Sequence, residues 1–207
     1  MHYVNDYSPV FNRVNYSATI NEGVAMGYQV INIHATDNDT GSQGDVFYAL
    51  NGGNIGSSFN VNRTSGAITT AGKIDRETTA VYDLIVKAFD GAVEENVRFT
   101  EEHVIVYILD LNDNAPKFTK DSFTSFVKET ADINDVILRV GALDRDAGEN
   151  AALRFSIMSG NSDGYFDISA ATGDIFVNRS LDLEGSAPPL LNYSLGKVRF
   201  LKHIRKN

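Results

Sequence analysis

Apolar residues alternate with polar ones along much of the chain, in short runs bounded by Gly, Asn or Asp. Such runs are typical of β-strands with one buried face. No segment of the first half keeps a helical period, so we expect at most minor helices. About seven strands of this spacing predict a Greek-key antiparallel β-sandwich. The runs in the first half are Val30–Ile33, Val46–Leu50, Phe59–Val61, Ala67–Thr69, Tyr82–Val86 and Val97–Leu109.

The pattern repeats without a gap after 107 residues. This register holds from Asn5 and Asn112 to Glu77 and Glu184. The sequence therefore predicts two tandem copies of one all-β, immunoglobulin-like sandwich, residues 1–115 and 116–207, with the boundary near Pro116. Matching pairs include Pro9 and Pro116, Glu22 and Glu129, Asp37 and Asp144, Asp39 and Asp146, Gly66 and Gly173, Asp75 and Asp182.

Composition excludes several classes of protein. The 207 residues carry a net charge of −9, which disfavours a nucleic-acid partner and favours a cation. The chain has no Cys, so disulfide frameworks, thiolate metal sites and cysteine nucleophiles are excluded. The longest strongly apolar stretch, Val104–Leu109, is too short to span a bilayer, and the first residues lack the features of a signal peptide.

Acidic residues recur at the ends of the predicted sandwiches. If the loops meet there and the linker between the sandwiches is short, seven carboxylates lie close together. Only two nearby cations, Arg76 and Arg145, are available to neutralise them. Unit charges about 4 Å apart repel by several kcal/mol in a low-dielectric setting. The seven residues are Glu22, Asp75, Glu77, Asp110, Asp113, Asp144 and Asp146.

A divalent cation relieves this repulsion. Ca²⁺ takes six to eight oxygen ligands from carboxylates, amides and backbone carbonyls, whereas Mg²⁺ demands a tighter octahedron. Zinc prefers His or Cys, and the chain has only four scattered His. The residue types therefore favour calcium.

These motifs resemble the linkers and end loops of cadherin extracellular repeats. The resemblance runs from Asn5 to about Leu195 and rests on Glu22, Asp75-Arg76-Glu77, Asp110-Leu111-Asn112-Asp113-Asn114-Ala115-Pro116-Lys117-Phe118, Asp144-Arg145-Asp146 and Gly148-Glu149-Asn150. It implies a rod of calcium-clamped sandwiches on the extracellular face of the plasma membrane. The implied function is calcium-dependent cell–cell adhesion through other cadherin molecules, homophilic or heterophilic, with no enzymatic activity and no small-molecule substrate.

The resemblance implies three calcium ions at the linker. The first ion would use Glu22, Asp75, Glu77 and Asp113; the second would share Glu22, Glu77 and Asp113 and add Asp110, the Leu111 carbonyl and Asp146. The third would use Asn112, the Asn114 carbonyl, Asp144, Asp146 and the Asn150 carbonyl. Counting from Tyr193, the position that matches Asp90 is Leu201, so the third site departs from the family pattern.

Both ends of the chain resemble halves of further linkers, as expected for a fragment of a longer array. Residues 1–9 resemble the remnant of a preceding linker, and membrane attachment would come from segments outside this chain. The residues of the two half-sites are Asn5, Asp37, Asp39 and Asp90 at one end, and Glu129, Asp182 and Glu184 at the other.

The last stretch breaks the repeat. Residues 196–207 carry five basic residues and no acidic one, so we expect the second copy to be truncated or divergent after about residue 195, and less stable than the first. A basic arm for an acidic surface is the alternative reading. Loss of a last strand would expose a sheet edge.

Other motifs point elsewhere. Asp39-Thr40-Gly41 matches the aspartic-protease triplet but lies among polar residues, and the second copy has Ala147 in place of Thr40.

A calcium-dependent carbohydrate-binding or surface-scaffold module remains a rival function, and it would need exposed aromatic residues on one sheet face. Five glycosylation sequons begin at Asn15, Asn38, Asn62, Asn178 and Asn192, and would fit a secreted glycoprotein.

Overall fold

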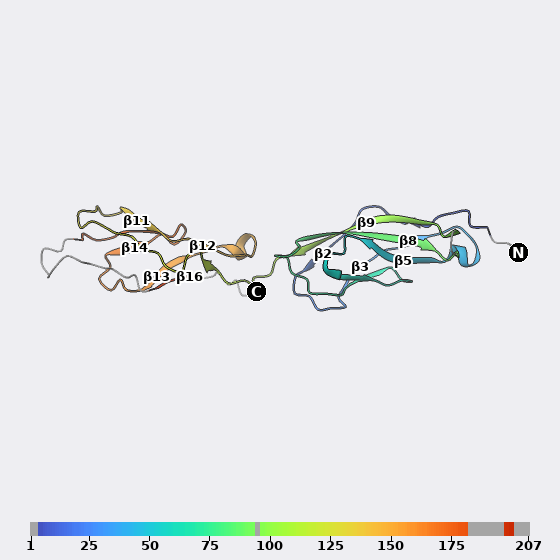
Figure 1. Ribbon diagram of the computed structural model, residues 1–207, viewed down its shortest axis with the longest axis horizontal. Helices are drawn as coiled ribbons and strands as arrows, with labels where there is room; N and C mark the ends of the chain where they lie inside the picture. The colour runs from blue at the N-terminus through green and yellow to red at the C-terminus, as the bar shows by residue number, and fades with distance from the viewer. Residues whose placement is uncertain (1–3, 94–95, 182–196, 201–207) are drawn as a thin grey trace. The chain divides into compact units, whose positions relative to one another are not determined.

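A computed structural model of the chain describes residues 4–93, 96–181 and 197–200. The chain divides into two compact units, Met1–Leu111 and Asn112–Asn207. Both units are built from β-strands, so the predicted all-β class is confirmed (Figure 1). Short 3₁₀ turns lie at Gly41–Gly44, Ile55–Ser57 and Gly148–Ala151.

A four-stranded sheet forms one layer of the first unit. Its order is β2 (Tyr16–Asn21), β9 (Phe99–Leu109), β8 (Val81–Asp90) and β5 (Val46–Gly52), with β8 and β9 adjacent in Figure 1. Strand β2 runs parallel to β9 over six residue pairs, from Tyr16 with Val104 to Asn21 with Leu109. This pair departs from the antiparallel arrangement that we predicted, because alternation reveals which face is buried and says nothing of strand direction.

The second layer of this unit has three strands in the order β3, β7, β6. A two-stranded ladder joins β1 to β4. Each predicted run overlaps a strand, although β9 starts at Phe99 instead of Val97 and β8 continues to Asp90, four residues beyond the predicted end. Strands β1, β2 and β4 were not among the predicted runs. The strands are β3 (Gln29–Asn32), β7 (Ala67–Thr70), β6 (Phe59–Val61), β1 (Val10–Phe11) and β4 (Ala35–Thr36).

The core of the first unit lies between its two layers. Buried side chains alternate along β8, at Tyr82, Leu84, Val86 and Ala88. The Tyr82 ring meets Phe59 of the facing sheet edge to face, with centroids 4.9 Å apart. Because every second side chain of a strand faces the core, the alternation of apolar and polar residues in the sequence indicated a sandwich.

The second unit repeats this architecture. Its buried core residues, Val140, Phe155, Phe166, Ile175, Val177 and Leu181, each lie 107 positions after a buried residue of the first unit. Its sheets have the orders β11-β15-β14, β13-β16 and β10-β12. The strands are β10 (Lys117–Phe118), β11 (Val136–Arg139), β12 (Ala142–Leu143), β13 (Phe155–Ser159), β14 (Phe166–Ile168), β15 (Asp174–Val177) and β16 (Lys197–Phe200).

Strand β16 lies in the basic stretch that we expected to break the repeat. Phe200 pairs with Phe155, as Ala88 pairs with Tyr48 in the first unit. Strand β16 therefore takes the place of β8, one residue later than the count from Tyr193 predicts. The rest of the expected divergence, with Leu201, lies outside the described residues. Within the described ranges, no helix is long and apolar enough to cross a membrane.

The core makes a direct prediction. Ile68 is fully buried, so we expect Ile68→Ala to lower the free energy of unfolding of the first unit by about 2 to 5 kcal/mol, through lost burial and the cavity left behind. Ile55 is 60% exposed, and Ile55→Ala should change it by less than about 1 kcal/mol. Urea unfolding followed by circular dichroism tests this, and equal losses in the two variants would contradict the described core.

An ion pair on the outward face of β8 and β9 gives a second prediction. Asp83 lies 2.7 Å from His103 Nδ1, and its hydrogen bond and charge raise the pKa of His103. The pair therefore stabilises the fold below the unfolded pKa of about 6.5, and this contribution is lost as pH rises through the folded pKa. We expect Asp83→Asn to lower the His103 pKa in an NMR titration. Asp45→Asn should leave it unchanged, and an unchanged pKa in Asp83→Asn would refute the pairing.

Candidate metal centre

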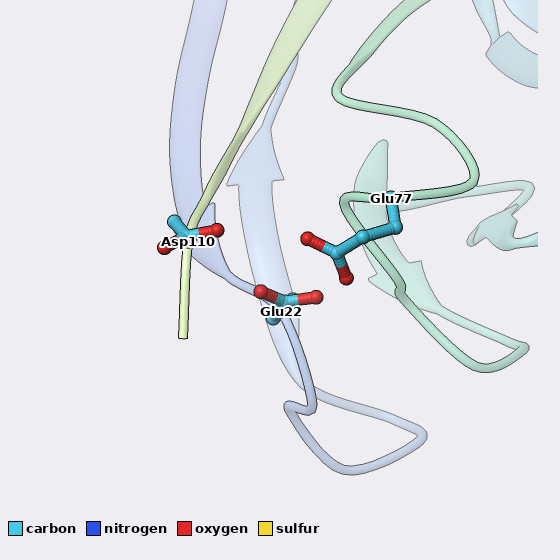
Figure 2. Close-up of side chains that lie close together, drawn as sticks. All are labelled: Glu22, Glu77 and Asp110. Carbon is cyan, nitrogen blue, oxygen red and sulfur yellow. The ribbon is translucent and has the colours of Figure 1, made fainter. Parts of the chain in front are cut away.

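Three carboxylates meet at one end of the first unit. Glu22 follows β2, Glu77 lies in the loop before β8, and Asp110 follows β9. One oxygen from each lies within 4.8 Å of the others, and Figure 2 shows that the three side chains come from separate segments. The structure thus brings together three of the predicted site residues that are far apart in sequence.

Glu22 is the best-buried member of this cluster. The residue is only 3% exposed. Its two carboxylate oxygens accept hydrogen bonds from two backbone N–H groups. Oε2 accepts from Arg76, at 2.9 Å, and Oε1 accepts from Leu111, at 2.6 Å. Each carboxylate oxygen has a further lone pair, so the same group can also bind a cation.

Arg76 lies at the cluster, as expected for a nearby cation, but the sequence did not predict which carboxylates it contacts. Its guanidinium donates to Asp110 Oδ1 and to Glu77 Oε1, each at 2.5 Å. Burial lowers the pKa of Arg76, but the hydrogen bonds and charges of Asp110 and Glu77 outweigh it, and the net pKa is raised. The Asp-Arg-Glu triplet was the available signal, since its central cation lies between two acids in sequence.

Asp75 lies beside the cluster without belonging to the group of three. The Lys73 ammonium is 3.2 Å from its carboxylate, and this hydrogen bond lowers the pKa of Asp75. The Asp75 carbonyl accepts from the N–H groups of Thr78 and Thr79, which fixes the turn that carries Glu77. Leu111, whose carbonyl was predicted to bind an ion, is half exposed and contributes its N–H to Glu22.

A second acidic group lies at the start of the second unit. Asp146 is 6% exposed, and its Oδ1 accepts from the backbone N–H and the side-chain Nδ2 of Asn114, at 3.1 and 2.7 Å. Asn114 Nδ2 also donates to Asp113, and the Asp146 N–H donates to Asp144 Oδ1 at 3.0 Å. Four of the predicted residues therefore form one connected network.

Two predicted residues flank this network. Asn112 is exposed, and Asn150 lies in the 3₁₀ turn Gly148–Ala151, where its N–H donates to the Ala147 carbonyl at 3.1 Å. At the other expected half-site of this unit, Glu129 lies in an exposed turn. Asp182 and Glu184 lie outside the described residues.

The opposite end of the first unit holds the other predicted half-site. Asp90 is 1% exposed, and its Oδ2 accepts from Asn5 Nδ2 and from the Arg98 N–H, at 2.8 and 3.0 Å. Asp39 accepts from the N–H groups of residues 6 and 7, and its own N–H donates to Asp37 Oδ1. Asn5 Oδ1 and Asp37 Oδ2 are buried without a hydrogen-bond partner. Buried oxygens of this kind suit a cation.

The donor set determines which chemistry these groups support. Carboxylate and amide oxygens line all three clusters among the described residues, and oxygen ligands are those that Ca²⁺ and Mg²⁺ prefer. Three carboxylates at the spacing of Glu22, Glu77 and Asp110 repel each other by about 3 to 4 kcal/mol per pair at a dielectric constant of about 20. Arg76 offsets part of this repulsion, and a divalent cation would offset the rest.

Comparison with known proteins identifies the family. The family model named Cadherin domain matches residues 16–109 and 123–195. The chain belongs to the cadherin family. Each unit holds one of the two matched ranges, and the Glu22 cluster lies at the end of the first cadherin domain.

Relatives of this cadherin chain are much longer. It is 37% identical over 185 residues to human cadherin EGF LAG seven-pass G-type receptor 3, covering 87% of the chain and 6% of the relative. It is 38% identical over 190 residues to human protocadherin Fat 4, covering 91% and 4%. The chain thus spans well under a tenth of these curated relatives. The crystal structure of mouse cadherin-23 EC22–24 is 28% identical in sequence and has a TM-score of 0.79. The match covers 86% of the present chain and 56% of the cadherin-23 chain.

The Arg76 contacts predict how this cadherin responds to loss of one charge. We expect Arg76→Gln to lower the free energy of unfolding in chelator by about 1 to 3 kcal/mol, because Glu77 and Asp110 lose a charged partner. In a few millimolar Ca²⁺ the loss should be smaller, since the ion replaces the missing positive charge. Thermal melts in both buffers test this, with Arg154→Gln at an exposed site as the control. A loss that is the same in both buffers would contradict a cation at this cluster.

Proposed function

We propose that this chain is part of the extracellular rod of a cell-adhesion cadherin, and that Ca²⁺ bound at its acidic clusters stiffens the rod. The observation that carries this proposal is the approach of Glu22, Glu77 and Asp110 within 4.8 Å of one another. Arg76 offsets part of the repulsion in this cluster, and a cation among its oxygens would offset the rest.

The ligands of the proposed ions come from both units. Glu22, Asp75, Glu77, Asp110 and the Leu111 carbonyl belong to the first unit, and Asn112, Asp113, Asn114, Asp144, Asp146 and Asn150 belong to the second. An ion bound by residues of both units would replace repulsion between acidic loops by shared coordination. Loss of calcium would then loosen the joint.

A further ion is proposed at the other end of the first unit, with Asn5, Asp37, Asp39 and Asp90. The buried and unpartnered Asn5 Oδ1 and Asp37 Oδ2 support it, because a buried polar atom without a partner costs about 1 to 3 kcal/mol. A bound cation would remove that cost for both oxygens at once.

The biological role follows from stiffness. A rod presents its tip to an opposing cell and carries load only if its joints hold, so weak sites matched to millimolar extracellular calcium would keep it rigid outside the cell. The proposed partners are other cadherin molecules, and the proposed location is the extracellular face of the plasma membrane.

Carbohydrate binding has less support. On the outward face of β9 the half-exposed aromatic rings are Phe99 and Tyr107. They lie eight residues apart, which is about 27 Å along a strand, too far to hold one sugar ring between them. Lys87 Nζ also covers the Phe99 ring, at 3.8 Å from its centroid.

The test is a thermal melt of the whole chain in chelator, in a few millimolar Ca²⁺ and in the same concentration of Mg²⁺. An ion that binds only the folded state stabilises it by about 2.7 kcal/mol at 100 times its dissociation constant, so calcium should raise the melting temperature and magnesium should raise it less. Most of the calcium effect should be lost in Asp113→Ala.

The control is Asp121→Ala, which removes an exposed carboxylate outside the clusters and should keep the calcium effect. If calcium leaves the melting temperature of the folded wild-type chain unchanged, the calcium mechanism is wrong even though the fold and family stand.

A further inference from the structure

We propose that Asn62 carries an N-linked glycan. This inference rests on the proposed extracellular location, because the transfer of N-linked glycans takes place inside the secretory pathway. Asn62 begins the sequon Asn62-Arg63-Thr64 in the turn between β6 and β7, and residues 62 to 65 are all exposed. A sequon needs such an exposed turn to accept a glycan.

The turn holds the Asn62 side chain in one orientation. Its Oδ1 accepts from the Thr64 N–H and the Thr64 Oγ1 hydroxyl, both at 3.1 Å, and from the Ser65 N–H at 2.9 Å. Among the described residues, its Nδ2 donates no hydrogen bond. The oxygen is thus engaged three times while the reactive nitrogen remains available.

This arrangement suits the chemistry of glycan transfer. Nδ2 attacks C1 of a sugar held by a polyisoprenyl diphosphate, the C1–N bond forms, and the C1–O bond breaks. The diphosphate leaves with the electron pair, and Nδ2 loses one proton to a base of the transferring enzyme. Donors on Oδ1 draw electron density from the amide and make its N–H more acidic, which favours loss of that proton.

Two backbone hydrogen bonds within six residues close the turn. The Asn62 N–H donates to the Ala67 carbonyl, and the Gly66 N–H donates to the Asn62 carbonyl, at 2.8 and 3.0 Å. Gly66 has φ 70°, and a Cβ there would lie 2.3 Å from the Ile33 carbonyl oxygen, so glycine is required. The acceptor geometry is therefore present in the folded unit.

Arg63 does not block the acceptor. Its guanidinium stacks on the rings of Phe47 and Phe89, 4.8 Å from each centroid, and its carbonyl accepts from the Tyr48 N–H at 2.8 Å. These contacts hold the middle residue of the sequon against β5 and β8. They leave the side chains of Asn62 and Thr64 on the exposed side of the turn.

The other sequons in the described ranges lack this geometry. Asn178 Nδ2 donates to the Gly164 carbonyl at 3.1 Å, so its nitrogen is engaged. The hydroxyl residue that follows Asn15, Ser17, lies within β2 and pairs with Ile105 of β9. Asn38 lies between Asp37 and Asp39 of an acidic cluster.

The second unit contains the same turn without a sequon. Its Ser169 N–H donates to Asp174, and the Gly173 N–H donates to Ser169, at 2.8 and 2.9 Å, matching the bonds of Asn62. The Ser169 hydroxyl accepts from the Thr172 N–H at 3.2 Å. Ser169→Asn combined with Ala171→Thr therefore installs the sequon in a matched backbone.

The chain is translated behind a cleavable signal sequence in the presence of endoplasmic-reticulum microsomes. Each glycan is detected as a step in the apparent mass of the protein that endoglycosidase treatment removes. Peptide N-glycosidase in oxygen-18 water then hydrolyses each glycosylated Asn to a labelled Asp, which mass spectrometry locates. We expect the label at residue 62, with one step lost in Asn62→Asp, which keeps the Oδ1 acceptor of the turn, and in Thr64→Ala. Thr64→Ser should restore the step, and Asn60→Gln should retain it.

The combined substitution at Ser169 and Ala171 should add one step. A wild-type chain that is translocated into microsomes and bare at residue 62 would overturn the inference, as would a step that survives Asn62→Asp. Calcium melts of the same material separate the two proposals. If Asn62 is glycosylated and calcium leaves the melting temperature unchanged, only the calcium proposal is wrong. If calcium raises the melting temperature and Asn62 carries no glycan, only the glycan proposal is wrong.

Discussion

The buried carboxylate of Glu22 is the constraint on which this end of the first cadherin domain depends. Its two oxygens accept the N–H groups of Arg76 and Leu111, so one side chain joins the end of β2, the loop before β8 and the exit of β9. A buried charge of this kind is tolerated only when its hydrogen bonds are satisfied. Glu77 and Asp110 are consequently held close to Glu22. The three carboxylates repel one another, and the charge of Arg76 offsets part of this repulsion.

The two units show how one backbone serves different side chains. The turn at Asn62 and the turn at Ser169 share their backbone hydrogen bonds, and each ends in a glycine with positive φ, Gly66 and Gly173. The side chain at the first position accepts the following N–H groups in both cases, through an amide oxygen in one and a hydroxyl in the other. Because the turn constrains only an oxygen acceptor there, the rest of the side chain is free to take a chemical role.

Much of the architecture could be predicted from the sequence because its signals are local. Alternation at Tyr82, Leu84 and Val86 marked a buried strand face, and the 107-residue register located two copies of one fold. The parallel pairing of β2 with β9 could not be predicted, since it depends on contacts about 88 residues apart. The gathering of Glu22, Glu77 and Asp110 followed from loops at one end of a sandwich. The two backbone N–H donors to Glu22 and the guanidinium contacts of Arg76 could not be predicted, because they depend on where individual backbone and side-chain groups point.

Parallel pairing of β2 with β9 has a mechanical consequence. The chain enters β2 at Tyr16, opposite Val104 in the middle of β9, and it leaves β9 at Leu109, opposite the last residue of β2, Asn21. Tension applied to the two ends of the first domain therefore pulls these neighbouring strands in opposite directions along their length. All six residue pairs share such a shearing load together, whereas a hairpin pulled from its open ends releases its pairs one after another. The strand order that closes this sandwich also makes it resistant to extension.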